Sequence, residues 1–127
     1  MRIAHTALWT RDLDAAAGFW ERYFGANVGE AYHSRNRPGF VSRFLQLPDG
    51  QDQIELMTGP WLEAETLSER IGWDHIAISL GNAAAVDALA ARCRADGCLK
   101  SGPRTTGDGF YEAVITMPDG TPVEITA

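Results

Sequence analysis

The sequence predicts an α+β protein built from two β-α-β-β-β units in tandem, and three observations lead to this prediction. Two similar strand patterns, IAHTALW at residues 3–9 and DHIAISL at 74–80, lie about 70 residues apart. Each is followed by a helical pattern of apolar residues. Each half then ends with two apolar runs joined by a Pro-Asp-Gly turn, which begins at Pro48 and again at Pro118.

Local signals define the individual elements. In the strand at 74–80, aliphatic residues alternate with polar or small ones, which indicates one core face and one face with space for a ligand. Asp12 and Asn82 are N-cap residues for the two helices, and Gly25 and Gly97 end them. The first half is predicted as strand 3–9, helix 12–24 and strands 27–33, 39–47 and 52–58. The second is predicted as strand 74–80, helix 82–96, strand 98–101, a loop at 102–108 and strands 109–117 and 121–126. The connector 59–72 has apolar residues compatible with a short helix.

Length and composition restrict the class of protein. At 127 residues the chain has the length of one domain, predicted over 1–127 with repeats at about 1–58 and 73–127. The net charge of −6 and the lack of a Lys/Arg run argue against nucleic-acid binding. No long apolar span or signal peptide is evident, so we expect no membrane insertion and a cytoplasmic location. Cys93 and Cys98 fit neither a disulfide framework nor a zinc motif, and a buried free thiol is expected at Cys93.

Four residues at matching places in the two halves are candidates for chemistry: His5, Glu55, His75 and Glu124. Each lies in a strand, on the face opposite its aliphatic neighbours. Taken singly, such a His is most often structural and such a Glu most often solvated. Their twofold recurrence favours a metal site, because two imidazoles and two carboxylates suit Zn, Ni, Co, Mn or Fe(II). Four ligands on an octahedral ion would leave two positions for water or substrate oxygens.

With these residues in this repeat, the chain resembles the vicinal-oxygen-chelate superfamily, and within it bacterial glyoxalase I (lactoylglutathione lyase). The resemblance is carried by RIAHTALWTRDLDAAAGFWERYFGA, DHIAISL and MPDGTPVEI. It implies the glyoxalase/bleomycin-resistance/dioxygenase fold, in which tandem βαβββ modules form a curved mixed sheet. It also implies one divalent ion per site, Ni²⁺, Co²⁺ or Zn²⁺, held by the four candidate residues, and a small-molecule substrate.

The resemblance to glyoxalase I further implies a reaction and an assembly. The metal would bind adjacent oxygens of a thiohemiacetal, formed from a 2-oxoaldehyde and a thiol. Glu124 would move the carbon-bound proton through an enediolate, and Glu55 would be its symmetric counterpart. A homodimer would share its sites, with His5 and Glu55 of one chain facing His75 and Glu124 of the other. A site built within one chain is the alternative.

Other functions of similar proteins stay open. The stretch RTTGDGFYEAVITM resembles fosfomycin-resistance thiol transferases, and acyl-CoA epimerases use the same kind of proton abstraction. Bleomycin-sequestering proteins are the non-catalytic alternative, although they lack such a ligand set. Trp9 and Gly59 stand where glutathione-using relatives carry Arg and Asn, so the thiol is left open. Lys100 and Arg104 either hold an anionic substrate group or are solvated loop cations.

Overall fold

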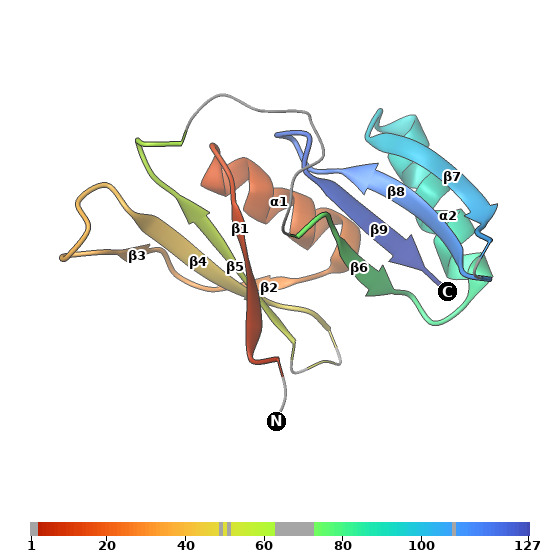
Figure 1. The fold of residues 1–127 in the computed structure, drawn as a ribbon, viewed down its shortest axis with the longest axis horizontal. Helices are drawn as coiled ribbons and strands as arrows, with labels where there is room; N and C mark the ends of the chain where they lie inside the picture. The colour runs from red at the N-terminus through yellow and green to blue at the C-terminus, as the bar shows by residue number, and fades with distance from the viewer. Residues whose placement is uncertain (1–2, 49, 51, 63–72, 108) are drawn as a thin grey trace. The chain divides into compact units, whose positions relative to one another are not determined.

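The computed structural model describes residues 3–48, 50, 52–62, 73–107 and 109–127. The chain divides into two compact units, Met1–Thr66 (unit 1) and Leu67–Ala127 (unit 2). Within the described residues, each unit has one sheet and one helix (Figure 1). The connector helix considered from the sequence falls at 63–72, outside the described residues.

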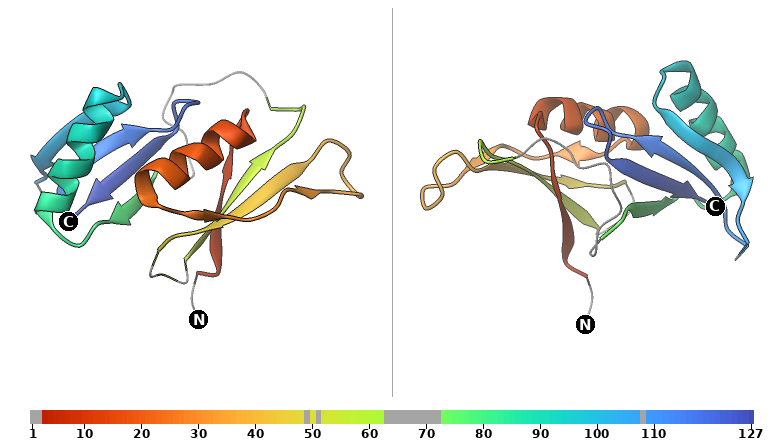
Figure 2. Two further views of the ribbon diagram at one scale, coloured as in Figure 1. Left: turned by 180° about the vertical axis from the view of Figure 1, so that it is seen from behind. Right: turned by 45° about the horizontal axis from the view of Figure 1, so that its top comes forward.

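Unit 1 contains a five-stranded mixed sheet with strand order β1-β5-β4-β2, and β3 pairs with β4. Strand β1 runs parallel to β5, and the other pairs are antiparallel. Helix α1 packs against β2, β4 and β5, on one side of the sheet (Figure 2). The elements are β1 (His5–Trp9), α1 (Leu13–Phe24), β2 (Asn27–Val28), β3 (Tyr32–His33), β4 (Val41–Gln46) and β5 (Gln53–Thr58).

The first helix begins and ends as its capping residues predict. The side chain of Asp12 accepts a hydrogen bond from the Ala15 backbone N–H at 2.9 Å. Gly25 closes the helix at φ 63°, a left-handed conformation that glycine adopts without steric cost. The buried face centres on Trp20, which is 0% exposed and belongs with Leu45 and other apolar residues to the core. Among the described residues of this unit, no helix covers the opposite face of the sheet.

Unit 2 repeats the arrangement with a four-stranded sheet in the order β6-β9-β8-β7, in which β6 runs parallel to β9. Its helix packs against β7, β8 and β9, and its N-cap is Asn82. Cys93 on that helix is buried, and burial raises the pKa of its thiol to about 12, so the expected buried free thiol is confirmed. The elements are β6 (Ile76–Ser79), α2 (Ala83–Ala95), β7 (Leu99–Thr105), β8 (Tyr111–Thr116) and β9 (Pro122–Thr126).

The predicted α+β fold of two similar modules with mixed sheets is confirmed, and two strands differ in detail. The strand predicted at 27–33 is divided into β2 and β3. Val28 pairs with Leu45 and Tyr32 with Ser42, so one extra residue is accommodated there as a bulge. In the helices that the structure describes, no segment is long and apolar enough to cross a membrane.

The second difference is at β7, where the prediction of a loop from residue 102 was wrong. The strand continues to Thr105 through two register shifts against β8. One lies between Leu99 and Ser101, and the other, between Ser101 and Arg104, accommodates Gly102 and Pro103. Gly102 has φ 87°, and a Cβ there would lie 2.9 Å from the Ala113 Cα. Because Gly102 has no side chain, β7 can approach β8 closely. The strand therefore continues beyond Gly102 and includes Arg104.

Candidate active site

The parallel pairing in unit 1 places a histidine diagonally across from a glutamate. Ala7 of β1 is in register with Glu55 of β5, and His5 lies on the same face as Ala7. The His5 Nε2 and Glu55 Oε2 atoms are 3.8 Å apart, and their side chains are 44% and 16% exposed. Phe44 packs edge-on against the His5 ring, with centroids 5.2 Å apart. This pair lies on the face of the sheet opposite α1.

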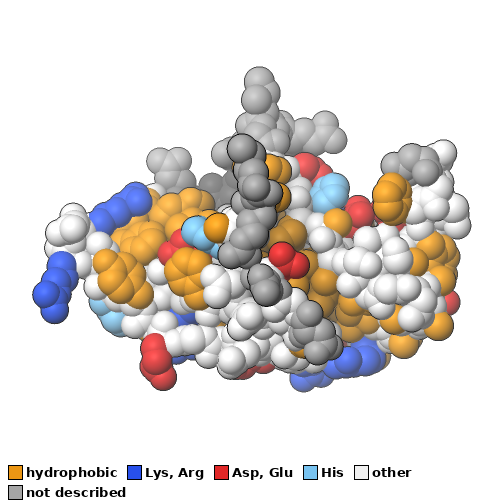
Figure 3. All heavy atoms as spheres, turned by 90° about the horizontal axis from the view of Figure 1, so that it is seen from below, with side chains coloured by type: hydrophobic (Ala, Val, Ile, Leu, Met, Phe, Trp, Pro, Cys, Tyr) orange, Lys and Arg blue, Asp and Glu red, His pale blue; other side chains and the backbone are white. Residues whose placement is uncertain are grey.

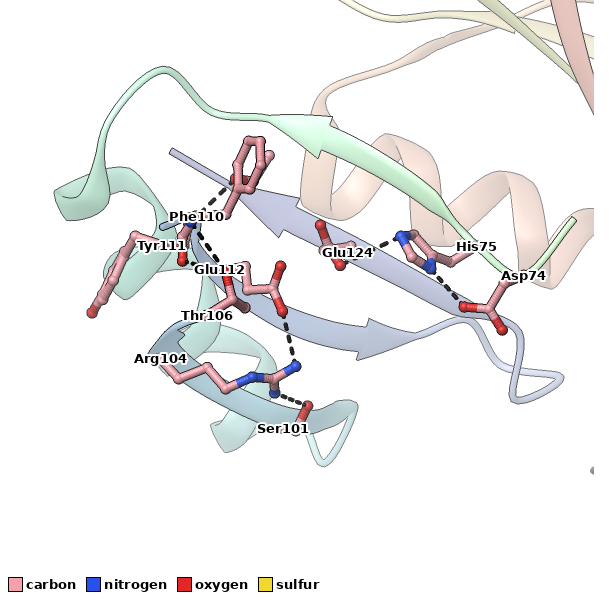
Figure 4. A network of polar contacts seen from close by, with 10 residues as sticks. Asp74, His75, Ser101, Arg104, Thr106, Phe110, Tyr111, Glu112 and Glu124 are labelled. Atoms are coloured by element: carbon pink, nitrogen blue, oxygen red, sulfur yellow. Dashed lines mark hydrogen bonds and ion pairs between the residues drawn. The ribbon is translucent and has the colours of Figure 1, made fainter. Parts of the chain in front are cut away.

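Unit 2 contains the same arrangement (Figure 4). Ala77 of β6 is in register with Glu124 of β9. The His75 Nε2 and Glu124 Oε2 atoms are 3.4 Å apart, and the side chains are 40% and 17% exposed. His75 directly precedes β6, so the prediction that it lies within a strand was wrong by one residue. His5 and His75 lie about 70 residues apart in the sequence, and each pairs with a glutamate on the neighbouring parallel strand.

His75 is also held from its other ring nitrogen. Its Nδ1 lies 2.7 Å from the Asp74 Oδ2 atom. This hydrogen bond raises the pKa of His75, burial opposes the rise, and the nearby Glu124 carboxylate adds to it. In the neutral imidazole, an Nδ1–H that donates to Asp74 leaves the Nε2 lone pair directed toward Glu124. This second contact is typical of histidines that bind metals.

A further carboxylate, which the sequence prediction missed, adjoins Glu124. Glu112 of β8 is buried, and its Oε1 accepts a hydrogen bond from the Arg104 Nη2 at 2.8 Å. Arg104 also donates from Nη1 to the Ser101 Oγ at 3.0 Å. Figure 4 shows the Glu112 and Glu124 side chains on the same side of the sheet. The available sequence signal was a glutamate inside a mostly apolar strand, YEAVIT.

The Glu112 carboxylate affects the protonation of Glu124. Burial is the largest cause that raises the pKa of Glu124, and the charge of Glu112 raises it further. His75 and Arg104 lower it, without reversing the direction. The two cations in or near the predicted loop, Lys100 and Arg104, both lie on β7. Arg104 is paired with Glu112, whereas Lys100 is exposed.

The structure thus brings the four predicted site residues together as two pairs, one in each unit. Among the described residues, no group of three or more His, Cys, Asp and Glu side chains is suited to hold a metal ion. Each unit by itself offers one imidazole nitrogen and one carboxylate, both partly accessible to solvent. This donor set fits a divalent ion with mixed nitrogen and oxygen ligands, if two pairs combine.

Trp9 and Gly59 both adjoin Trp61 in unit 1. Trp9 is 41% exposed and makes an edge contact with the Trp61 ring, with centroids 6.4 Å apart. A Cβ on Gly59 would overlap Cζ2 of Trp61. The indole of Trp61 therefore occupies the space into which a side chain at position 59 would extend.

Comparisons of the sequence with known proteins identify relatives of this chain. The sequence matches the model of the Glyoxalase/Bleomycin resistance protein/Dioxygenase superfamily over residues 2–125. A relative of unknown function, PA2024 of Pseudomonas aeruginosa, is 34% identical over 104 residues, which cover 80% of this chain and 70% of that protein.

Two solved structures show the same fold at low sequence identity. The trypanothione-dependent glyoxalase I of Leishmania major superposes with a TM-score of 0.75 at 22% identity, covering 99% of this chain and 86% of its own. A point mutant of the fosfomycin resistance protein FosX from Listeria monocytogenes, in complex with Mn(II) and 1S,2S-dihydroxypropylphosphonic acid, has a TM-score of 0.71. Its identity is 20%, with 99% of this chain and 91% of the FosX chain covered.

Proposed function

Because the chain belongs to the Glyoxalase/Bleomycin resistance protein/Dioxygenase superfamily, we propose that it is a metal-dependent isomerase or lyase of the glyoxalase I type. Its substrate would be the thiohemiacetal of a 2-oxoaldehyde and a thiol. The observation that carries the proposal is the pairing of a histidine with a glutamate in both units, at 3.8 Å and 3.4 Å. A purely drug-sequestering protein has no need for two equivalent pairs of metal-binding side chains.

His5, Glu55, His75 and Glu124 would hold one divalent ion, and Ni²⁺, Co²⁺ and Zn²⁺ all suit this donor set. When bound, the ion would supply Lewis-acid stabilisation of the negative charge that develops on the substrate oxygens. The contact between Asp74 and His75 supports this role, because it orients the ring and keeps Nε2 available.

The proton transfer would fall to a carboxylate of the chain. Glu124 would remove the carbon-bound proton and return it to the neighbouring carbon. In the metal-free protein, burial and the adjacent Glu112 carboxylate raise the pKa of Glu124, which makes it a stronger base than an exposed glutamate. Glu55 would be the symmetric counterpart in unit 1.

The proposal includes the assembly of a complete site. Each unit contributes two of the four ligands, so a unit 1 must face a unit 2. In the proposed homodimer, unit 1 of one protomer faces unit 2 of its partner, and symmetry produces two identical sites.

Elemental analysis of the purified protein, combined with turnover of methylglyoxal in the presence of several thiols, tests the proposal. We expect about one divalent ion per chain and metal-dependent turnover with at least one thiol. His5→Ala and His75→Ala should each lose most of the metal, whereas His33→Ala, at an exposed histidine of β3, should retain it. Full metal occupancy in both site variants, or a metal-free wild type that binds drugs without turnover, would contradict the proposal.

A further inference from the structure

A guanidinium group is surrounded by three aromatic rings in unit 1. The Arg37 Cζ lies 3.9 Å from the centroid of the Trp61 ring, 5.7 Å from that of Trp9 and 5.9 Å from that of Phe40. Trp9 also contacts Phe40 edge-on, with centroids 6.0 Å apart. We call Arg37, Trp9, Phe40 and Trp61 the Arg37 cluster.

The backbone that carries Arg37 forms a loop closed by hydrogen bonds among Ser34, Arg37 and Phe40. The Ser34 N–H donates to the Phe40 carbonyl at 3.1 Å, and the Phe40 N–H donates to the Arg37 carbonyl at 3.0 Å. The Arg37 N–H donates to the Ser34 Oγ at 3.0 Å. A Cβ on Gly39 would lie 2.7 Å from Cδ of Pro60, so this loop packs tightly against the segment that carries Trp61. Arg37 is thus presented from a hydrogen-bonded loop rather than from a free end.

The arrangement leaves the polar edge of the guanidinium for another group. A guanidinium whose Cζ lies over an aromatic ring still has N–H donors that match a carboxylate or phosphate. Among the described residues, no carboxylate forms an ion pair with Arg37. Trp9 and Arg37 are both exposed. Figure 3 shows hydrophobic side chains gathered beside Lys or Arg atoms in the left part of the view, where β3 and β4 lie.

We propose that the Arg37 cluster binds an anionic group, of carboxylate or phosphate chemistry, at the end of an elongated substrate remote from the reacting atoms. Trp9 follows His5 by four residues on the same face of β1, which places it about 13 Å along the strand. The aromatic rings would contact the apolar part of the substrate next to its charge. The statement that the reacting atoms are remote from the Arg37 cluster rests on the proposed function. The binding of an anion by the cluster does not depend on that function.

Binding of small matched probes to the purified protein, followed by isothermal titration calorimetry, tests this site. The probes are 4-phenylbutyrate, its neutral amide 4-phenylbutyramide, phenyl phosphate and phenyltrimethylammonium. Wild-type protein should bind phenylbutyrate about tenfold or more tightly than the amide, since a charge-assisted hydrogen bond typically contributes that much. The ratio between phenyl phosphate and phenylbutyrate then distinguishes phosphate from carboxylate as the natural group.

Three variants separate binding from a structural role. Arg37→Gln should abolish the preference for the anions and leave amide binding unchanged, and Arg37→Lys should retain part of it. Arg35→Gln is the matched control, because it removes another exposed cation of the same loop and should keep the full preference. Thermal melting of each variant verifies that it is folded.

Several results would overturn the inference: no anion preference in the wild type, a preference that survives Arg37→Gln, or equal loss of both probes in that variant. Tighter binding of phenyltrimethylammonium than of phenylbutyrate would instead show a cation site from which Arg37 is displaced, and would also overturn it. These measurements need neither metal nor turnover. Absence of isomerase activity would therefore leave an observed anion site intact, and failure of the anion site would leave the metal proposal intact.

Discussion

Replacing Arg104 with Met should destabilise the protein, because the change leaves a buried carboxylate without its cation. The Glu112 side chain is 8% exposed and accepts a 2.8 Å hydrogen bond from Arg104. It also lies next to Glu124, whose negative charge it would then face without the guanidinium. Met fills a similar volume, so the loss of charge is the main effect.

The exposure of the two side chains sets the magnitude. Removing one partner of a fully buried ion pair costs about 3–5 kcal/mol, whereas an exposed pair contributes about 0–1 kcal/mol. Arg104 is 48% exposed and therefore partly screened by solvent. An intermediate decrease of about 1–3 kcal/mol in the free energy of unfolding is expected at pH 7, which corresponds to a decrease of about 4–12 °C in Tm.

The loss should depend on pH. Arg104 lowers the pKa of Glu124, so its removal should raise the folded-state pKa of Glu124 further above the value in the unfolded chain. A group with a raised folded-state pKa contributes stability at low pH that is lost as the pH rises through that pKa. The stability difference between wild type and Arg104→Met should therefore be larger at pH 7 than near pH 4.5.

Urea denaturation at the two pH values measures both effects. Arg94→Met is the control, since the exposed Arg94 guanidinium makes a 3.5 Å contact with the Gly102 carbonyl, and its loss should change stability by less than about 0.5 kcal/mol. Adding Glu112→Gln to Arg104→Met should restore part of the stability, because it removes the unpaired charge. If Arg104→Met is as stable as Arg94→Met at pH 7, or if its deficit grows on acidification, the reasoning is refuted.

Three further predictions concern the candidate active site. Asp74→Asn should lower the pKa of His75, because the hydrogen bond to Asp74 is the largest cause that raises this pKa. NMR titration of the metal-free protein measures the pKa, and an unchanged value would contradict the prediction. The stability that His75 protonation provides at low pH, and that is lost as the pH rises through its folded-state pKa, should diminish in the same variant. Glu124→Gln should reduce turnover by orders of magnitude and abolish the incorporation of solvent deuterium, whereas Glu112→Gln should keep measurable turnover. Full activity of the Glu124→Gln variant would exclude Glu124 as the base. Mixing His5→Ala protein with His75→Ala protein should restore activity after subunit exchange, because one site of the hybrid dimer is then intact. A monomer by sedimentation, or no rescue after verified exchange, would argue against shared sites.

Much of the fold was predictable because its signals are local. Alternation of apolar residues identified β1 and β6, and capping residues located both helices to within a residue. The repeat then placed His5 and His75 at equivalent positions without knowledge of any contact. The pairing of each histidine with a glutamate in its own unit agrees with that symmetry, and their role as metal ligands stays a prediction.

Other features depended on which strands and loops meet, and no local pattern records this. The contact between Arg104 and Glu112 requires two register shifts between β7 and β8, the second of which keeps Gly102 and Pro103 within β7. The Gly-Pro pair by itself favours a turn. The position of Arg37 over Trp61 depends on two loops that are packed together through Gly39 and Pro60. Register and loop packing are set by long-range contacts between segments, so only the tertiary structure decided which charges lie beside Glu124 and which cation lies beside Trp9.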